Sequence, residues 1–301
     1  MIAHGSLWIA FTVLAAAGQT LRNVMQRGLI ATLGTVGATH IRFIFGLPFA
    51  ILFLVGVRLG TGTPIPLPGA VPLLWTAFGA AAQFIATALM LATMRNRSFV
   101  VTTAFIKTEP VQTAVFALMF LGEAVRPLTL LAIAVATAGV MLASWPRKDL
   151  AGTAANSWRK AMPGIAAGGC FALSSVGYRG GITSLGEPSF VMAASTILVA
   201  SLTIHTAVLA SFLVLKDRPT MLAILRLWRP SLLAGFLGAL ASQFWFLAFA
   251  LADAASVRTL GLVEMLFAGI VSRRLLKQGS PFLELIGLVL IVGGVAILVS
   301  R

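Results

Sequence analysis

The residues that could do chemistry in this 301-residue chain are a few ionisable side chains inside long apolar stretches. They are Lys107, Glu109 and Glu264, together with His40 and Arg42. A charge in apolar surroundings is costly unless it is paired or hydrated, so each marks a structural ion pair or a functional group. In the functional interpretation, one partner exchanges with the charged end of a substrate or takes a proton. The sequence leaves both interpretations open.

Lys107 and Glu109 cannot easily pair with each other, because residues two apart on a helix face roughly 200° away. Each therefore needs a partner on another helix, and the pairs Lys107 with Glu264 or Arg42 with Glu109 would meet that need. Pro110 removes a backbone hydrogen bond to the carbonyl of Ile106 and should bend the helix beside Glu109. We interpret Pro110 as a hinge or as a static kink. His205 is expected to be a packing residue.

Polar and aromatic residues recur at helical spacing in five apolar stretches, which predicts one hydrated central cavity. Amide and hydroxyl groups there suit the ammonium and carboxylate of a zwitterion, and aromatic rings suit an apolar side chain. The alternative is that the Gln and Ser residues hold neighbouring helices together. The predicted substrate-binding residues are Gln19, Gln83, Phe105, Glu109, Gln112, Phe171, Ser175, Tyr178, Gln243 and Trp245.

Enzyme active sites are not indicated. The three histidines, His4, His40 and His205, are scattered, and Cys170 is the single cysteine. Metal ligands or a nucleophile with its base would have to be clustered. We therefore expect no enzyme activity, no metal and no cofactor.

Ten apolar stretches fill the chain almost end to end. The elements that they form must position the candidate site residues. Of all residues, 59% are hydrophobic and 10% are charged, against roughly 25% charged in a soluble domain. Segments of about 20 apolar residues are typical of membrane-spanning helices, which pair all backbone groups internally. The sequence predicts an all-α polytopic membrane protein with spans at 6–26, 37–57, 69–93, 99–120, 128–145, 161–180, 189–213, 231–251, 256–275 and 282–300.

The formal net charge of +14 is interpreted as an orientation signal. Most of the 22 Lys and Arg residues fall in or beside odd-numbered loops, which the positive-inside rule assigns to the cytoplasm. Both termini are then periplasmic, and the basic loops contact anionic lipid. Nucleic acid binding is not needed to explain the charge. The even-numbered loops and the C-terminus have five arginines, Arg58, Arg126, Arg179, Arg258 and Arg301.

The two halves of the chain resemble each other. Residues 79–84 (GAAAQF) match residues 239–244 (ALASQF), and further along Glu109 matches Glu264. Residues 1–150 and 151–301 are therefore predicted to be two five-helix repeats. Five is an odd number, so the second copy enters the membrane from the opposite side and the repeats are inverted.

This order of spans, with the segment Thr108-Glu109-Pro110-Val111 and the ending Leu121-Gly122-Glu123, resembles the EamA branch of the drug/metabolite transporter superfamily. Glycines in the fifth and tenth spans (Gly139, Gly287, Gly293, Gly294) add to the resemblance. The second half departs from it, with Glu264-Met265 in place of Glu109-Pro110 and Lys277-Gln278-Gly279 in place of Leu121-Gly122-Glu123. Strict symmetry between the two halves is therefore not implied.

Within that branch the chain looks most like the aromatic amino acid exporters of bacterial inner membranes. The resemblance implies export of aromatic or other large neutral amino acids and related small metabolites by alternating access. A multidrug exporter of lipophilic cations, which would want an unpaired carboxylate, and a passive metabolite channel are the alternatives. The expected partners are the small-molecule substrate and membrane lipid, and we expect a monomer.

Overall fold

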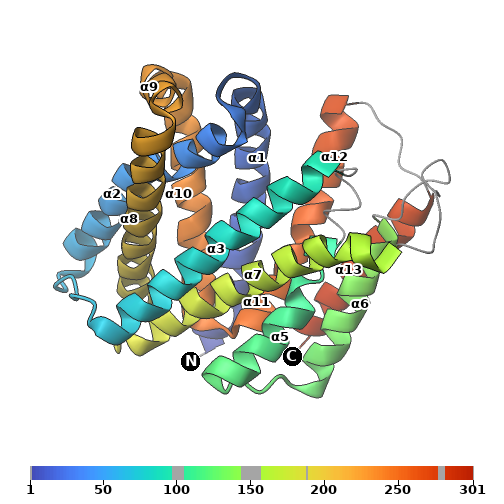
Figure 1. Cartoon of the computed structure of the whole chain (residues 1–301). Helices are drawn as coiled ribbons and strands as arrows, with labels where there is room; N and C mark the ends of the chain where they lie inside the picture. Colours follow the sequence, from blue (N-terminus) through green and yellow to red (C-terminus); the bar gives the residue numbers. More distant parts are fainter. Residues whose placement is uncertain (1, 97–104, 144–156, 188, 277–281, 301) are drawn as a thin grey trace. The chain divides into compact units, whose positions relative to one another are not determined.

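The computed structural model describes residues 2–96, 105–143, 157–187, 189–276 and 282–300, and these contain helices and no strand. The helices are α1 (Ile2–Ile44), α2 (Gly46–Thr61), α3 (Ala70–Asn96), α5 (Glu109–Leu121), α6 (Pro127–Ala143), α7 (Ser157–Ser184), α8 (Phe190–Lys216), α9 (Arg218–Arg226), α10 (Trp228–Leu251), α11 (Ala254–Leu260), the 3-10 helix η3 (Gly261–Val263), α12 (Glu264–Leu276) and α13 (Phe282–Val299) (Figure 1). The predicted all-α class is confirmed for the described residues.

The chain forms two compact units, and neither coincides with a predicted repeat. Unit 1 contains residues 1–80 and 177–252, and unit 2 contains residues 81–176 and 253–301. The division cuts through α3 and α7, so each unit draws helices from both halves of the sequence. The assignment of residues 1–150 and 151–301 to two inverted repeats stays a prediction.

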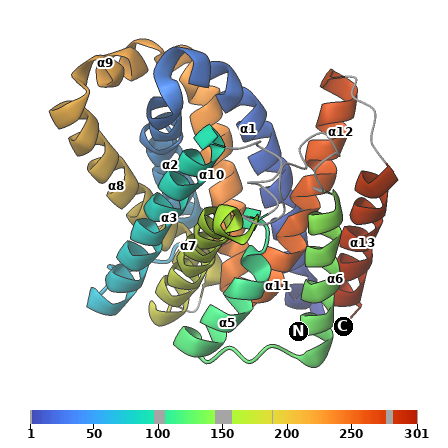
Figure 2. The ribbon, with the colours of Figure 1, turned by 45° about the vertical axis from the view of Figure 1, so that its right-hand side comes forward.

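In unit 1, α1 packs along α10, and α2 and α8 pack against each other and against α10 (Figures 1 and 2). Small residues allow the close approach: a Cβ added at Gly18 would lie 3.3 Å from the Cβ of Ala241. At one end, Leu33, Ile41, Leu213, Ile224 and Ala234 form a buried apolar cluster. This cluster joins α1, α8, α9 and α10.

The long helix α1 changes direction at Gly34, whose φ of 65° lies in the left-handed region that favours glycine. Predicted span 6–26 lies before this kink. Predicted span 37–57 consists of the end of α1 followed by α2, with Phe45 between them. Gly34 thus separates the predicted spans 6–26 and 37–57, which share the long helix α1.

In unit 2, α6 and α13 lie side by side in both ribbon views (Figures 1 and 2). A Cβ added at Gly287 would lie 2.4 Å from the backbone nitrogen of Ala143, closer than any real side-chain contact. Gly139 and Gly294 are equally crowded. Gly139, Gly287 and Gly294 therefore lie in the contact surface between these two helices.

Four helical segments of the described residues are long and apolar enough to cross a membrane: Val36–Thr61, Ala70–Met90, Phe190–Lys216 and Trp228–Leu251. Three shorter apolar helices, Glu109–Leu121, Pro127–Ala143 and Leu283–Val299, fall in three further predicted spans. The total of ten spans stays a prediction.

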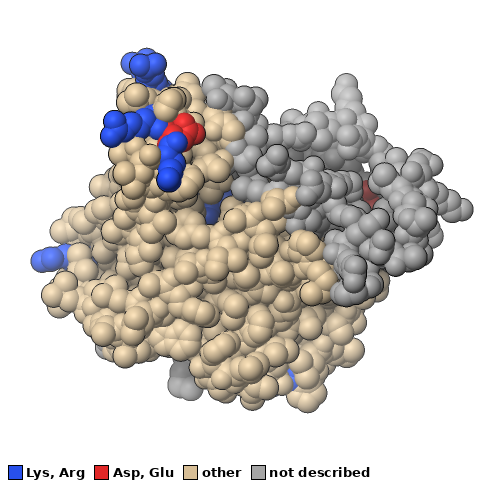
Figure 3. Space-filling model, viewed as in Figure 1, with Lys and Arg blue, Asp and Glu red and all other residues tan. Residues whose placement is uncertain are grey.

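Exposed basic residues gather around α9 in unit 1. Lys216, Arg218, Arg226 and Arg229 are all exposed at or near the ends of this short helix. Figure 3 shows Lys and Arg gathered at the position of α9, while most of the other described surface on that face is uncharged. The exposed apolar residues Leu222 and Trp228 lie among them, a composition typical of a helix at the membrane interface.

Candidate functional site

Predicted span 99–120 is not one continuous helix. Lys107 and Thr108 form a turn, and α5 begins at Glu109. Pro110 lies in the first turn of α5, where its missing N–H is not needed for an intrahelical bond. The structure thus has a break in the helix directly before Glu109 and Pro110, and the interpretation of Pro110 as a hinge stays a prediction.

Predicted span 256–275 is also interrupted. The short helix α11 ends at Leu260, three residues of 3-10 helix follow, and α12 begins at Glu264. Gly261 is a weak helix former, which favours the interruption at this point. Glu109 and Glu264, which the repeat alignment matches, are thus each the first residue of a helix after an interruption. A carboxylate at that position is stabilised by the helix dipole.

Glu109 forms an ion pair with Arg258 of α11, with 2.5 Å between the guanidinium nitrogen and the carboxylate. The Glu109 side chain is 4% exposed and the Arg258 side chain 18%. The hydroxyl of Ser175 lies 3.5 Å from the same carboxylate and donates to the carbonyl of Phe171 at 3.1 Å. The predicted partner Arg42 is therefore wrong, since Glu109 takes a cation from its own unit.

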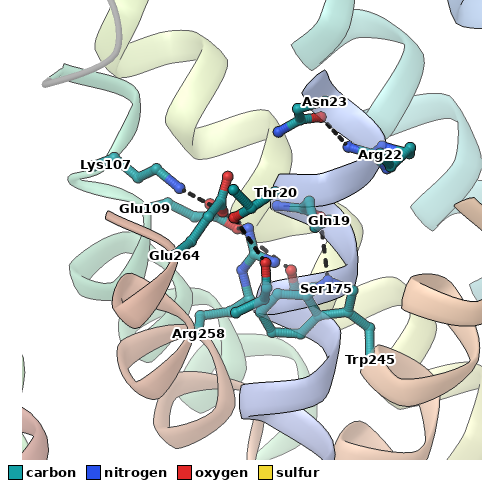
Figure 4. Close-up of polar contacts among 11 residues, drawn as sticks. Gln19, Thr20, Arg22, Asn23, Lys107, Glu109, Ser175, Trp245, Arg258 and Glu264 are labelled. Atoms are coloured by element: carbon teal, nitrogen blue, oxygen red, sulfur yellow. Dashed lines mark hydrogen bonds and ion pairs between the residues drawn. The ribbon is translucent and has the colours of Figure 1, made fainter. Parts of the chain in front are cut away.

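Lys107 pairs with Glu264, with 3.0 Å between Nζ and Oε2, which confirms that predicted pair. Figure 4 shows these two side chains pointing toward each other, as it does Glu109 and Arg258. The two pairs are crossed: each acid of one half of the sequence meets a cation of the other half. Because Lys107 and Glu109 are two residues apart, both pairs meet at the same turn.

Arg258 is absent from the site residues predicted from the sequence, because the loop-charge pattern counts it as a residue of an even-numbered loop. The sequence does contain an indication that Arg258 needs a partner. Predicted span 256–275 contains Arg258, so the argument that a charge within a span needs a partner applied to it as well.

The short helix α11 is held by the other end of α5. Glu123 accepts a hydrogen bond from the backbone N–H of Ala254, with 3.2 Å between the atoms. Gly122, with φ of 67°, ends α5 in the left-handed conformation that frees the chain to turn there. In the Leu121-Gly122-Glu123 ending, Gly122 therefore ends α5 and Glu123 binds the start of α11.

Gln112 serves as a link between helices in unit 2. Its amide donates to the hydroxyl of Thr108 at 3.0 Å and to the carbonyl of Ile165 in α7 at 3.2 Å. A Cβ added at Gly168 would lie 2.7 Å from the carbonyl oxygen of Ile106, so α7 approaches closely beside the turn. For Gln112 the interhelical interpretation describes the contacts better than substrate binding does.

In unit 1, predicted site residues from separate helices also meet. The indole N–H of Trp245 donates to Gln19 at 3.2 Å, as Figure 4 shows. The rings of Tyr178 and Phe246 lie 4.8 Å apart between centroids. Gln243 donates to the hydroxyl of Ser195 at 2.9 Å. Its Oε1 is buried and has no hydrogen-bond partner among the described residues.

Arg42 and His205 of unit 1 both lie against the ring of Phe43. The guanidinium of Arg42 lies 4.3 Å from the ring centre of Phe43, whose ring stacks on His205 at 4.3 Å. His205 is buried, and its Nδ1 lies 2.8 Å from the carbonyl of Ser201, which agrees with a packing role. His40 is fully buried, and neither of its ring nitrogens has a hydrogen-bond partner within the described parts of the chain.

The predicted site residues are divided between the two units. Unit 1 contains Gln19, His40, Arg42, Tyr178, Gln243 and Trp245, and unit 2 contains Gln83, Phe105, Lys107, Glu109, Pro110, Gln112, Phe171, Ser175 and Glu264. One cavity lined by all of them stays a prediction. Over the residues that the structure describes, three or more His, Cys, Asp or Glu do not come together in a way that could hold a metal.

Comparison with known proteins gives one family match and a similar fold among the solved structures. Residues 6–145 match the EamA-like transporter family. A solved structure described only as the crystal structure of a protein is similar over 99% of this chain and 96% of that chain, with 14% sequence identity and a TM-score of 0.70. That likeness shows a shared fold alone. No curated protein matches the chain. Over residues 6–145 the chain thus resembles the EamA-like transporter family, which supports the predicted resemblance to the drug/metabolite transporter superfamily.

Proposed function

We propose that this chain exports aromatic or other large neutral amino acids, and related small metabolites, across the bacterial inner membrane by alternating access. The proposal builds on the match of residues 6–145 to the EamA-like transporter family and on the charge balance of the two interrupted helices in unit 2. It includes ten membrane spans in two inverted repeats, with both termini periplasmic.

The observation that carries the substrate class is the pairing of both acids. Glu109 and Glu264 each have a cation at 3.0 Å or less within unit 2. A carrier of lipophilic cations needs a carboxylate that the drug can neutralise, because an unpaired charge in apolar surroundings is expensive. Here that charge is already balanced, which favours a substrate with no net charge. A zwitterionic amino acid meets this requirement.

Amide and aromatic side chains also favour amino acids as the substrate class. In unit 1, Gln19 and Trp245 combine a hydrogen-bonding amide with an indole, and Tyr178 lies against Phe246. In unit 2, the partly buried Phe171 lies one helical turn before Ser175 on α7. Aromatic side chains of a substrate gain from contact with such rings.

Alternating access is supported by the two interruptions. Paired helix interruptions at corresponding positions of inverted repeats are the usual place of the substrate site in secondary transporters. The interruptions before Glu109 and before Glu264 fall at matched positions of the predicted repeats. Motion of one repeat against the other would then carry the site from one face of the membrane to the other.

Counterflow in proteoliposomes tests the proposal. Vesicles are loaded with unlabelled phenylalanine and placed in a trace of labelled phenylalanine. A carrier gives a saturable, transient accumulation of label that is absent from empty vesicles. A panel of leucine, tryptophan, lysine, glutamate and tetraphenylphosphonium as competitors then defines the class. Competition by tetraphenylphosphonium alone would favour the multidrug alternative, and non-saturating flux without counterflow would favour a channel.

A further inference from the structure

We propose that Arg258 and Glu109 are the head-group site of the substrate: the amino acid enters their ion pair, its carboxylate binding Arg258 and its ammonium binding Glu109. This inference rests on the proposed function, because it states how that carrier recognises a zwitterion. Arg258 thereby gains a role beyond membrane orientation.

Binding of a zwitterion between Arg258 and Glu109 leaves the net charge of the site unchanged. Before binding, the guanidinium and the carboxylate lie 2.5 Å apart as one pair. After binding, the same two groups each have an opposite charge on the ligand, so two pairs replace one and net charge is unchanged. Arg presents a planar fork of donors that matches a carboxylate, which a Lys ammonium does not.

Burial explains why both ends of the ligand matter. The side chains are 4% exposed at Glu109 and 18% at Arg258. Separating them without replacing both partners leaves one charge uncompensated in surroundings with little water. An amine without a carboxylate would take Glu109 away from Arg258 and offer Arg258 no carboxylate in exchange, and an acid without an amine would take Arg258 away from Glu109 and offer Glu109 no cation. The pair therefore selects a zwitterion against either single ion.

Arg258 lies on a helix that is anchored at its start, so its position is kept when Glu109 exchanges Arg258 for the ligand's ammonium. Its helix is anchored at its start by Glu123, which accepts from the N–H of Ala254. Asp253 also caps this helix by accepting from the N–H of Ser256 at 2.8 Å. All residues of α11 except Arg258 are buried. Arg258 is thus a charged group on a fixed, otherwise buried element.

Ser175 and Phe171 extend the site along α7. The Ser175 hydroxyl is 3.5 Å from the Glu109 carboxylate, a long contact that a ligand can replace. Phe171 lies four residues earlier and therefore on the same face of α7. An aromatic side chain of the ligand could lie against that face while its charged head occupies the ion pair.

The neighbouring pair provides a matched control. Lys107 and Glu264 lie 3.0 Å apart, and each side chain is 15% exposed. This pair shares the same turn and the same crossing between the two halves of the sequence. It lacks the guanidinium fork, so we do not assign it to binding of the substrate's head group.

The test compares three ligands of one shape: phenylalanine, phenethylamine and 3-phenylpropanoate. Their binding to purified protein in detergent is measured by equilibrium dialysis and by thermal shift. Wild-type protein should bind phenylalanine about tenfold or more tightly than either single ion. Glu109→Gln should lose that advantage and bind 3-phenylpropanoate more tightly than wild type, because the carboxylate of Glu109 no longer competes with the ligand for Arg258. Arg258→Gln should show the reverse, with phenethylamine gaining.

The controls are Lys107→Gln and Glu264→Gln, which should keep the wild-type order of the three ligands. The double variant Glu109→Gln with Arg258→Gln has no uncompensated charge, so it should fold and lose discrimination among the ligands. If it keeps the wild-type preference, or if both single variants lose all three ligands equally, the head-group assignment is wrong while the proposed function stands. If wild-type protein neither binds nor exchanges any amino acid, the proposed function itself fails, and this inference with it.

Discussion

The ammonium of Lys107 lies 3.0 Å from the carboxylate of Glu264, a residue 157 positions further along the chain. The reciprocal contact joins Glu109 to Arg258 at the same turn. Each half of the sequence therefore contributes one acid and one cation to a pair of crossed bridges. Such bridges tie the two interruptions together while leaving the net charge of the group at zero.

Removing one member of the Lys107 and Glu264 pair should destabilise the protein. Both side chains are 15% exposed, so the cost lies between those of surface and fully buried pairs, at about 1–3 kcal/mol for Lys107→Met or Glu264→Gln. The double variant should cost less than the sum of the two, because no uncompensated charge remains. Chemical unfolding in detergent micelles measures the cycle. Strictly additive losses would show that the pair is not energetically coupled.

Two glycines of α13 should respond oppositely to alanine. In Gly287→Ala the new Cβ would lie 2.4 Å from the backbone of Ala143, and overpacking of this kind costs about 1–3 kcal/mol. In Gly293→Ala the new methyl meets nothing within 4 Å, and alanine favours the helix by up to about 1 kcal/mol. Thermal unfolding of the two variants is the measurement. Equal stability would contradict the close contact of α6 and α13.

Glu264 is expected to carry the coupling proton if transport is driven by a proton gradient. Glu264→Gln cannot exchange a proton, so it should lose the stimulation of uptake by an imposed pH gradient. Its counterflow, which needs no driving force, should persist. Both are measured on the same proteoliposomes and normalised to folded protein. Unchanged stimulation by the gradient would remove Glu264 from the coupling step.

Both termini are expected to be periplasmic. A reporter enzyme that is active only in the periplasm, fused after Arg301, should give activity in whole cells. A fusion within the loop containing Lys216, Arg218, Arg226 and Arg229 should give none, because the positive-inside rule places that loop in the cytoplasm. The opposite pattern would reverse every assignment of inside and outside.

Several features follow from the sequence by itself, because they depend on local composition and spacing. Long apolar segments predicted the helical class, since lipid leaves the backbone few other ways to pair its polar groups. The alignment of the two halves matches Glu109 of the fourth predicted span to Glu264 of the ninth. Lys107 with Glu264 is one of the two pairs that the sequence suggests, because Lys107 and Glu109, two residues apart on a helix, cannot easily pair with each other.

Only the tertiary structure decided the rest. Hydropathy averages over about 20 residues, so it does not detect a two- or three-residue interruption that changes backbone hydrogen bonding without changing polarity. The partner of Glu109 depended on which helices pack together, and helical spacing says which residues share a face but not what that face meets. Arg258 therefore became a site residue only when α11 was found against α5, held there by Glu123.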